Sequence, residues 1–391
     1  MKTLKRTWAD ISLDNLEYNY RSIRAHLPKG TKFLGVMKAD AYGHGAVPVS
    51  RALADLGAEY LAVSNLEEAV QIRRGEVRLP ILILGYTPAE YAANMIFLDI
   101  TQEVHSLEYA RELNEALAGT NYILNVHLKL DTGMTRIGFF AYDNERTLDE
   151  LRQVAQLPHL HIEGVFMHFC VADSRAEADV SFTKLQYKRF MDMLSAMAGV
   201  GIRPEIRHCC NSGATILYPE FALDMVRPGI ITYGNAPSDE LEGALSLRPM
   251  MSLHSMIAQV RTVPAGTDIS YGRLYRTKEE TRVAVLPIGY ADGLSRLLTG
   301  KASFYLQGHQ VPVIGRICMD MCMVDITRVP EAKVGDVVTV FGEDGGDSIE
   351  LTSLANRLGS IPYELMCGIN KRIPRIYLNG EDETEVLQYI V

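Results

Sequence analysis

Residues 32–45 of this 391-residue chain read KFLGVMKADAYGHG. The apolar run Phe33–Met37 is typical of a buried strand, and the glycine-bearing segment after it is typical of a loop. Lys38 therefore stands where a buried strand ends. A lysine at the start of a loop is most often a surface residue, but a desolvated lysine loses its proton readily and can form a Schiff base. This position makes Lys38 a candidate for covalent chemistry.

The same strand and helix pattern repeats along the first part of the chain. Amphipathic stretches with apolar residues at helical spacing, such as Leu66–Arg74 and Phe182–Met197, separate the apolar runs. The predicted strands are Lys32–Met37, Tyr60–Val63, Ile81–Leu84, Ile96–Ile100, Ile123–Leu130, Ile162–Met167, Glu205–Cys209 and Leu223–Val226. Eight such units in about 230 residues predict a (β/α)8 barrel. A doubly wound sheet is the alternative, but it usually has fewer strands and often a glycine-rich first turn.

After Tyr233 the pattern changes to short strands separated by turns. The apolar runs there are Leu253–Val260, Arg282–Leu286, Val311–Ile314, Met323–Ile326 and Val337–Phe341, and Leu351–Leu358 is the one clear helical stretch. We therefore predict an α/β chain of two domains, a barrel over residues 1–240 and a mostly β domain over residues 241–391.

Composition excludes several classes of function. The net charge is −9, with acidic and basic residues interspersed, so no basic stripe suggests binding to nucleic acid or anionic lipid. No run approaches the roughly 20 apolar residues that span a bilayer. The six cysteines include no C-x-x-C pair, which argues against a zinc site and for reduced thiols. We expect a cytoplasmic protein without a metal, or the cytoplasmic catalytic part of a membrane-anchored protein.

Polar residues follow several of the predicted strands. In a barrel of this type the reactive groups lie at these strand ends, and the loops after strands seven and eight bind phosphate. The candidates at these ends are Arg136, His168, Asn211, Ser212 and the segment Arg227–Ile230. Taken singly, His168 is more often structural, and Asn211-Ser212 is as often a helix N-cap. Together they predict a barrel enzyme with a phosphate ligand and a reactive lysine.

These motifs resemble the alanine racemase family, in order and over nearly the whole chain, from Thr7 to Arg375. The segment Val36–Gly45 is similar to the ten-residue cofactor-lysine signature of that family. The resemblance implies pyridoxal 5'-phosphate bound covalently through Lys38, in a barrel followed by a β domain. It also implies a head-to-tail homodimer in which each active site receives loops from the partner's β domain.

The resemblance also implies roles around the cofactor. Residues expected near the cofactor, most of them at its phosphate, are Tyr42, Asn211, Ser212, Gly229 and Ile230. Arg227 matches the arginine that faces the pyridine nitrogen. Because an arginine is too weak an acid to protonate the ring, the cofactor becomes a poorer electron sink, and side reactions such as transamination compete less well. His168 is expected between Arg227 and Tyr271.

Racemisation requires a base on each face of the substrate, and the resemblance assigns these roles to Lys38 and Tyr271. Tyr271 would reach in from the partner subunit, with Met319 beside it. A tyrosine titrates near 10, so it needs a cationic surround to act near neutrality, and Arg136 near the substrate carboxylate would help. Lys129 matches a position that is often carbamylated in the family, where it would hold Arg136.

Asn370 departs from the family pattern, in which we expect a tyrosine. An asparagine is smaller and offers an amide donor and acceptor, so it should admit and hydrogen-bond the hydroxymethyl group of serine. The change resembles the serine racemases of vancomycin-resistance clusters, which join a membrane domain to an alanine-racemase-like part. The prediction is a serine and alanine racemase that supplies D-amino acids for peptidoglycan precursors. The alternative is a housekeeping alanine racemase with little serine activity.

Two other functions fit less well. A non-catalytic pyridoxal-phosphate carrier would consist of a lone barrel and would not need Tyr271. An amino-acid decarboxylase of the same architecture would carry a glycine-rich phosphate loop and a cysteine motif, and neither is evident.

Overall fold

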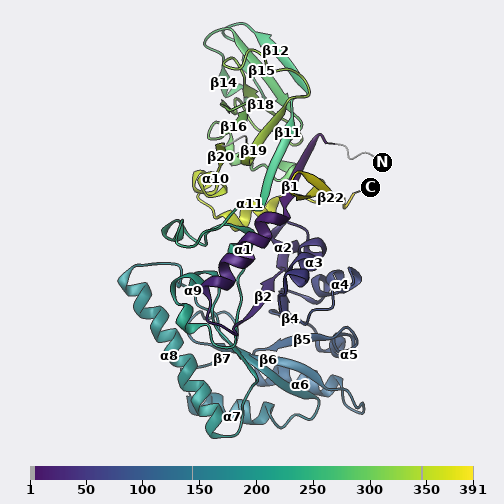
Figure 1. Ribbon diagram of the computed structural model, residues 1–391, viewed down its shortest axis with the longest axis vertical. Helices are drawn as coiled ribbons and strands as arrows, with labels where there is room; N and C mark the ends of the chain where they lie inside the picture. The colour runs from purple at the N-terminus through teal and green to yellow at the C-terminus, as the bar shows by residue number, and fades with distance from the viewer. Residues whose placement is uncertain (1–4, 143, 345–346, 391) are drawn as a thin grey trace. The chain divides into compact units, whose positions relative to one another are not determined.

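Eight parallel strands of this computed structural model close into a barrel, within the described residues 5–142, 144–344 and 347–390. Figure 1 labels several of these strands and the helices beside them. The barrel strands are β2 (Lys32–Val36), β3 (Tyr60–Val63), β4 (Ile81–Ile83), β5 (Ile100–Val104), β6 (Leu124–Asp131), β8 (Leu160–Phe166), β9 (Ile206–His208) and β10 (Met225–Val226). Each pairs in parallel with its neighbours in this order, and β10 pairs with β2 to close the ring. The predicted (β/α)8 barrel is confirmed, and a short strand, β7 (Phe139–Phe140), pairs in parallel with the end of β6.

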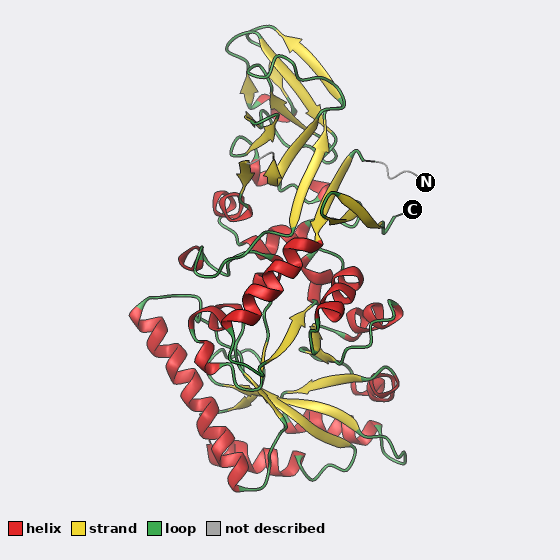
Figure 2. Cartoon of the chain, viewed as in Figure 1, coloured by secondary structure: helices red, strands yellow, loops and turns green. Residues whose placement is uncertain are grey.

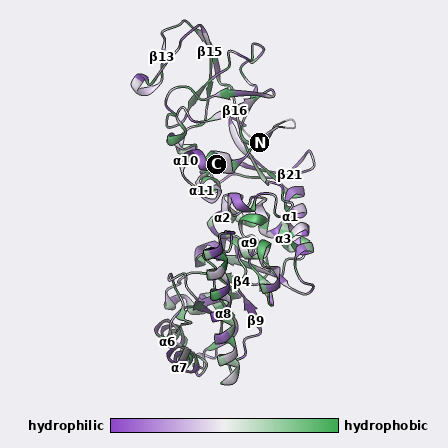
Figure 3. Ribbon diagram, turned by 90° about the vertical axis from the view of Figure 1, so that its left-hand side faces the viewer, coloured by the Kyte–Doolittle hydropathy of each residue, from purple (hydrophilic) through white to green (hydrophobic). Residues whose placement is uncertain are grey.

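Helices follow most of the barrel strands (Figure 2). They are α3 (Ala46–Leu56), α4 (Leu66–Arg74), α5 (Ala92–Phe97), α6 (Leu107–Ala116), α7 (Asn144–Val154), α8 (Glu177–Gly199) and α9 (Ser212–Leu217). Polar side chains cap the N-termini of several of these helices. Asn65 and Ser106 each accept a backbone N–H of the first turn, from Glu68 and Tyr109, which satisfies a donor that the helix leaves unpaired. The barrel helices carry both apolar and polar residues, as α8 shows (Figure 3), because only one side of each faces the core.

One predicted strand is misplaced. Residues Ala92–Phe97 form helix α5, and β5 begins only at Ile100. Strand β5 contains Gln102 and Glu103, both fully buried. The Gln102 amide donates to Gly85 O at 2.7 Å, and a Glu103 oxygen pairs with His105 Nδ1 at 2.8 Å. The Gln102 partner lies 17 residues back along the chain and the Glu103 partner is a histidine beyond the strand, so the sequence pattern favoured the apolar residues upstream.

The second unit is mostly β. Its main sheet has the order β17-β16-β19-β11-β1-β21-β22, and β20 pairs with β19. These strands are β1 (Thr7–Ser12), β11 (Met251–Met256), β16 (Ser303–Leu306), β17 (His309–Pro312), β19 (Val337–Asp344), β20 (Asp347–Ile349), β21 (Arg375–Asn379) and β22 (Asp382–Leu387). A three-stranded sheet comprises β12 (Gln259–Val263), β15 (Thr281–Leu286) and β18 (Cys322–Asp325). Helix α10 (Leu351–Leu358) has the predicted bounds, and α11 (Pro362–Gly368) follows it.

The first strand of the chain belongs to this β unit. Strand β1 pairs antiparallel with β11 and parallel with β21. By its contacts the β unit comprises the chain up to Leu16, the short segment Tyr42–Gly45 and everything from Pro249 onward. The barrel unit comprises Glu17–Ala41 and Ala46–Arg248. This division differs from the predicted ranges 1–240 and 241–391, because the partners of β1 lie more than 200 residues further along the chain.

Across the described residues, no helix combines the length and the apolar character that a membrane crossing requires.

Candidate active site

Lys38 begins an unusual turn at the end of β2. The next four residues, Ala39, Asp40, Ala41 and Tyr42, have φ between 52° and 55°. A left-handed conformation costs about 1–2 kcal/mol per non-glycine residue, so such a run persists only where its surroundings hold it. Two contacts do so in the barrel unit. The Asp40 carboxylate accepts the Ala46 N–H at 2.8 Å, and the Glu68 carboxylate accepts the Ala39 N–H at 2.7 Å.

Arg227 follows β10 and is buried, with 4% of its area exposed. Its guanidinium donates to the Met167 and Cys209 carbonyl oxygens at 2.7 and 3.1 Å. It also contacts His208 Nδ1 at 2.9 Å and His168 Nδ1 at 3.3 Å. Because a guanidinium has only donors, both Nδ1 atoms must accept. Burial lowers the pKa of Arg227 to about 10, so the side chain stays charged near neutrality.

Several cations lie around His168. The pKa of His168 falls well below its ordinary value, first because of burial and then because of four cationic side chains. These cations are Arg227, Lys129, Arg136 and Lys38. His168 is therefore neutral, with its proton on Nε2. The barrel unit thus brings together five of the predicted site residues, His168 and these four cations, in a positively charged cluster, which suits a ligand that carries phosphate and carboxylate groups.

Lys129 lies on β6 with 4% of its area exposed, whereas Arg136 is exposed in the following loop. Burial, then Arg227 and Arg136, lower the pKa of Lys129 to about 7. A substantial fraction of this lysine is therefore a neutral amine at physiological pH, which makes it more nucleophilic than an ordinary lysine.

The loops after β9 and β10 meet through Ser212. Its hydroxyl accepts the Gly229 N–H at 2.9 Å, and Ile230 begins a buried 3-10 turn. Asn211 is the N-cap of α9, since its side-chain oxygen accepts the Ala214 N–H at 3.0 Å. The N-cap role that we considered for Asn211 is observed. Ser212, Gly229 and Ile230 meet at one corner, where the Ser212 O–H and the Ile230 N–H could hold a phosphate.

Tyr42 and the glycines after it are held by the β unit. Arg375 is buried and donates to Gly43 O at 3.0 Å, and the Tyr377 hydroxyl donates to His44 O at 2.7 Å. A Cβ on Gly43 would lie 2.2 Å from Met366 O, so only glycine fits there. Tyr42 itself is buried, and burial raises the pKa of its phenol, which therefore stays protonated.

Tyr271 lies on the surface of the β unit, with 69% of its area exposed. It follows Ser270, whose hydroxyl donates to Arg316 O at 2.7 Å and whose φ is 64°. Met319 is also exposed, at 54%. Both side chains therefore lie where a neighbouring chain could bury them.

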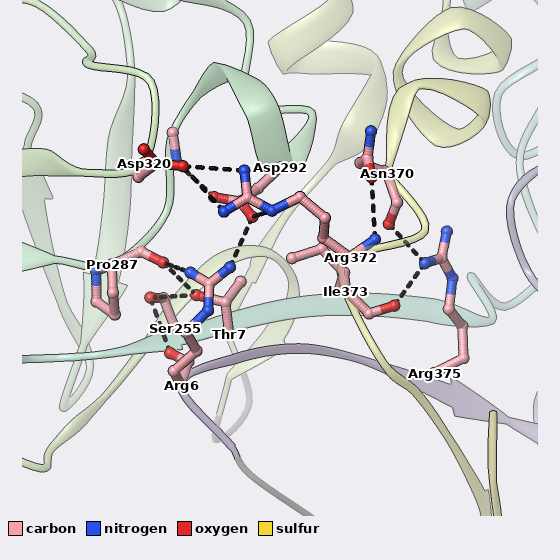
Figure 4. Close-up of polar contacts among 11 residues, drawn as sticks. Arg6, Thr7, Ser255, Pro287, Asp292, Asp320, Asn370, Arg372, Ile373 and Arg375 are labelled. Carbon is pink, nitrogen blue, oxygen red and sulfur yellow. Dashed lines mark hydrogen bonds and ion pairs between the residues drawn. The ribbon is translucent and has the colours of Figure 1, made fainter. Parts of the chain in front are cut away.

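Asn370 lies in a turn that is held by hydrogen bonds and an ion pair (Figure 4). Its side-chain oxygen accepts the Arg372 N–H at 3.0 Å, and its carbonyl oxygen accepts from Arg375 at 2.8 Å. Arg372 pairs with Asp320 at 2.9 Å, which ties this turn to the loop that carries Met319. The amide oxygen of Asn370 is therefore engaged locally, and its recognition of serine stays a prediction.

Sequence reasoning missed three polar residues of the barrel core, His127, Glu163 and His208. His127 and His208 are fully buried, and they link Arg227 to Glu163 by hydrogen bonds. Each stands inside a predicted apolar strand, and a polar residue in a buried strand is itself a signal that it has a partner.

Comparison with known proteins supplies the family. Residues 11–237 match "Alanine racemase, N-terminal domain" and residues 250–377 match "Alanine racemase, C-terminal domain". An alanine racemase of Desulfovibrio desulfuricans is 46% identical, over 95% of this chain and 98% of the relative. One of Clostridium tetani is 41% identical over the full length of both. The solved alanine racemase of Clostridium difficile covers both chains completely, with 39% identity and a TM-score of 0.93. That of Bacillus anthracis with bound L-Ala-P has 34% identity and a TM-score of 0.93, over 100% of this chain and 99% of the other.

Proposed function

Because the chain belongs to the alanine racemase family, we propose that it interconverts L- and D-alanine and supplies D-alanine for peptidoglycan precursors. Enzymes of this family depend on pyridoxal 5'-phosphate. The single observation that carries the proposal for this chain is the cationic cluster around His168, with Lys38 and Arg227 among its members. The β unit, which matches the family's C-terminal domain, distinguishes the chain from a lone-barrel carrier.

The residues of the barrel unit fit the cofactor. Lys38 offers the amine that would hold it. Ser212 and Ile230 offer donors for its phosphate, and Gly229 orients the Ser212 hydroxyl. Arg227 offers a guanidinium to the ring nitrogen, and because it keeps its own protons it leaves that nitrogen unprotonated. When bound, the cofactor acidifies the Cα–H bond of the attached amino acid. The Lys38 amine then accepts or delivers the Cα proton on one face of the substrate.

We assign the proton of the opposite face to Tyr271 of a second copy of this chain. Two observations support a homodimer with shared active sites. Tyr271 is largely exposed on its own β unit, and exposed Met319 and Leu274 are further apolar surface that a partner would cover. In addition, His168 carries its proton on Nε2, so it can donate a hydrogen bond to a phenolic oxygen. That hydrogen bond would orient the phenol toward the substrate.

Lys129 is expected to be carbamylated by carbon dioxide. Its pKa of about 7 leaves a neutral amine at pH 8, and the carbamate would be an anion that can pair with Arg136. The holoenzyme equilibrated with ¹³C-bicarbonate should therefore show a carbamate carbon signal by NMR. The signal should be lost in Lys129→Ala and retained in Lys184→Ala, which alters a lysine on helix α8 that has no part in the site. A signal that survives Lys129→Ala would contradict the assignment.

Chiral analysis of the purified protein with its cofactor tests the proposed function. L-alanine should become a mixture of equal parts of both enantiomers, and no inversion of alanine would overturn the proposal. The same assay with L-serine tests the finer prediction from Asn370. If its amide admits the serine hydroxymethyl group, Asn370→Tyr should reduce serine turnover about tenfold more than alanine turnover.

Lys371→Tyr is a matched control, because it places the same bulk at the adjacent exposed position. Equal losses on both amino acids in Asn370→Tyr would leave an alanine racemase without a serine-specific role for Asn370. A place in vancomycin resistance requires serine turnover, so a protein that does not invert serine would exclude that extension of the proposal.

A further inference from the structure

A chain of hydrogen bonds crosses the barrel core from Arg227 to Glu163. Arg227 contacts His208 Nδ1 at 2.9 Å, His208 Nε2 contacts His127 Nδ1 at 2.9 Å, and His127 Nε2 contacts Glu163 Oε2 at 3.0 Å. Both imidazoles are fully buried, and the Phe166 ring stacks on His208 with 4.9 Å between centroids. The chain joins strands β6, β8 and β9 to the loop that follows β10.

The position of every proton in this chain can be read from its Arg227 end. Arg227 can only donate, so His208 Nδ1 carries no proton and must accept. A neutral imidazole then has its proton on Nε2, and His208 donates to His127 Nδ1. His127 Nδ1 accepts in turn, so its own proton lies on Nε2 and is donated to Glu163. Every hydrogen bond of this chain is therefore donated in the same direction, from the Arg227 guanidinium toward the Glu163 carboxylate.

A bulge between strands β6 and β8 places Glu163 at the acceptor end of this hydrogen-bond chain. The register of β6 and β8 shifts there, with Val126 opposite Ile162 and His127 opposite Gly164, so Glu163 is the extra residue of a bulge. Bulges of this kind re-aim a side chain. A Cβ on Gly164 would lie 2.5 Å from the His127 ring, so glycine makes the room that the ring occupies.

Glu163 is a charged acceptor, and several donors to one of its oxygens favour the ionised form. The hydroxyl groups of Tyr60 and Thr101 donate to the same Oε2, at 2.7 and 3.3 Å. Although burial opposes ionisation, the hydrogen bonds from His127 and Tyr60 lower the pKa of Glu163. Burial, with Arg227 among the further causes, lowers the pKa values of both histidines, which agrees with two neutral rings between two opposite charges.

We propose that Glu163 is a positioning residue for Arg227, which it orients through His127 and His208 by fixing the direction of their hydrogen bonds. The proposal rests on the proposed function, in which Arg227 faces the ring nitrogen of the cofactor. An acceptor at position 163 holds the His127 proton on Nε2. His127 Nδ1 then accepts from His208, and the lone pair of His208 Nδ1 faces the Arg227 guanidinium. Without that acceptor, His127 can turn its proton toward His208, and His208 then presents an N–H to Arg227, where two donors would oppose each other.

Neutron diffraction from the deuterated holoenzyme reads the proton positions directly. We expect His127 and His208 each to carry a single deuterium, on Nε2. A deuterium on Nδ1 of His208, or two on either ring, would overturn the proposal even if no variant folds.

Two variants of position 163 separate orientation from packing. Glu163→Gln keeps an acceptor oxygen, so the proton order should persist, and kcat and cofactor affinity should stay within about threefold of wild type. Glu163→Leu removes the acceptor and should lower kcat and cofactor affinity by about tenfold or more, as loss of an outer hydrogen-bond partner does at metal sites. Tyr60→Phe is the control for stability, since it removes a bond to the same oxygen without breaking the chain. It should lower the melting temperature and leave kcat unchanged.

Equal losses of kcat in Glu163→Gln and Glu163→Leu, or no loss in Glu163→Leu, would refute the positioning role. Failure of the proposed function gives a different result, which is a wild-type protein that does not invert alanine. Proton positions and cofactor affinity would remain measurable in that case.

Discussion

Replacing Lys38 with alanine is expected to abolish racemisation and the near-visible absorption band of the bound cofactor together. Lys38 follows β2 after one residue, Met37, and the turn after it is held in a strained conformation. A side chain that both anchors the cofactor and moves a proton has no substitute, so the rate should fall by at least about 10⁴-fold, the upper range for a positioned proton-transfer group. Absorption spectra and chiral analysis of the same preparation measure both effects.

Lys32→Ala is the matched control, because Lys32 lies at the opposite, exposed end of the same strand. It should keep both the absorption band and the activity. Methylamine added to Lys38→Ala should restore part of the rate if the missing group is an amine. A Lys38→Ala protein that retains the absorption band would place the cofactor on another residue.

The barrel was predictable because its strands are short apolar runs between amphipathic helices, a pattern that depends on local sequence alone. Helix α4, for example, has the predicted bounds, Leu66–Arg74. Strand β5 was misplaced because its buried Gln102 and Glu103 look like surface residues until their partners are known. The sequence did not predict that the N-terminal strand β1 belongs to the β unit, because its pairing partners, β11 and β21, lie far along the chain.

The candidate site was predictable to the extent that its residues stand at strand ends or in a specific motif. Lys38, His168 and Arg227 were identified in this way, and the structure brings them together. His127 and His208, which link Arg227 to Glu163, were not identified, because each lies inside a strand that was recognised only by its apolar residues. The bulge at Glu163 depends on the register between β6 and β8, which no local pattern specifies.

Replacing Tyr271 with phenylalanine is expected to stop racemisation but not proton exchange at one enantiomer. The change removes only the phenolic oxygen, so the lysine base and the cofactor remain. In D₂O, Lys38 should still exchange the Cα proton that faces it, with retention, while inversion falls by about 10²–10⁴-fold. Mass spectrometry combined with chiral separation distinguishes exchange from inversion. Tyr305→Phe, on β16 of the same unit, is the control, and it should leave both exchange and inversion unchanged.

Mixing subunits then decides which chain supplies the phenol. A dimer of one Lys38→Ala and one Tyr271→Phe subunit has one site with both bases intact if Tyr271 acts across the interface, and none if it acts within its own chain. Because a two-fold dimer has two equivalent sites, random mixing of equal amounts should restore about a quarter of the wild-type rate. The exposure of Tyr271, at 69%, favours the first outcome, since a base must be covered to work in a dry site. An inactive mixture that nevertheless forms mixed dimers would assign Tyr271 to its own subunit.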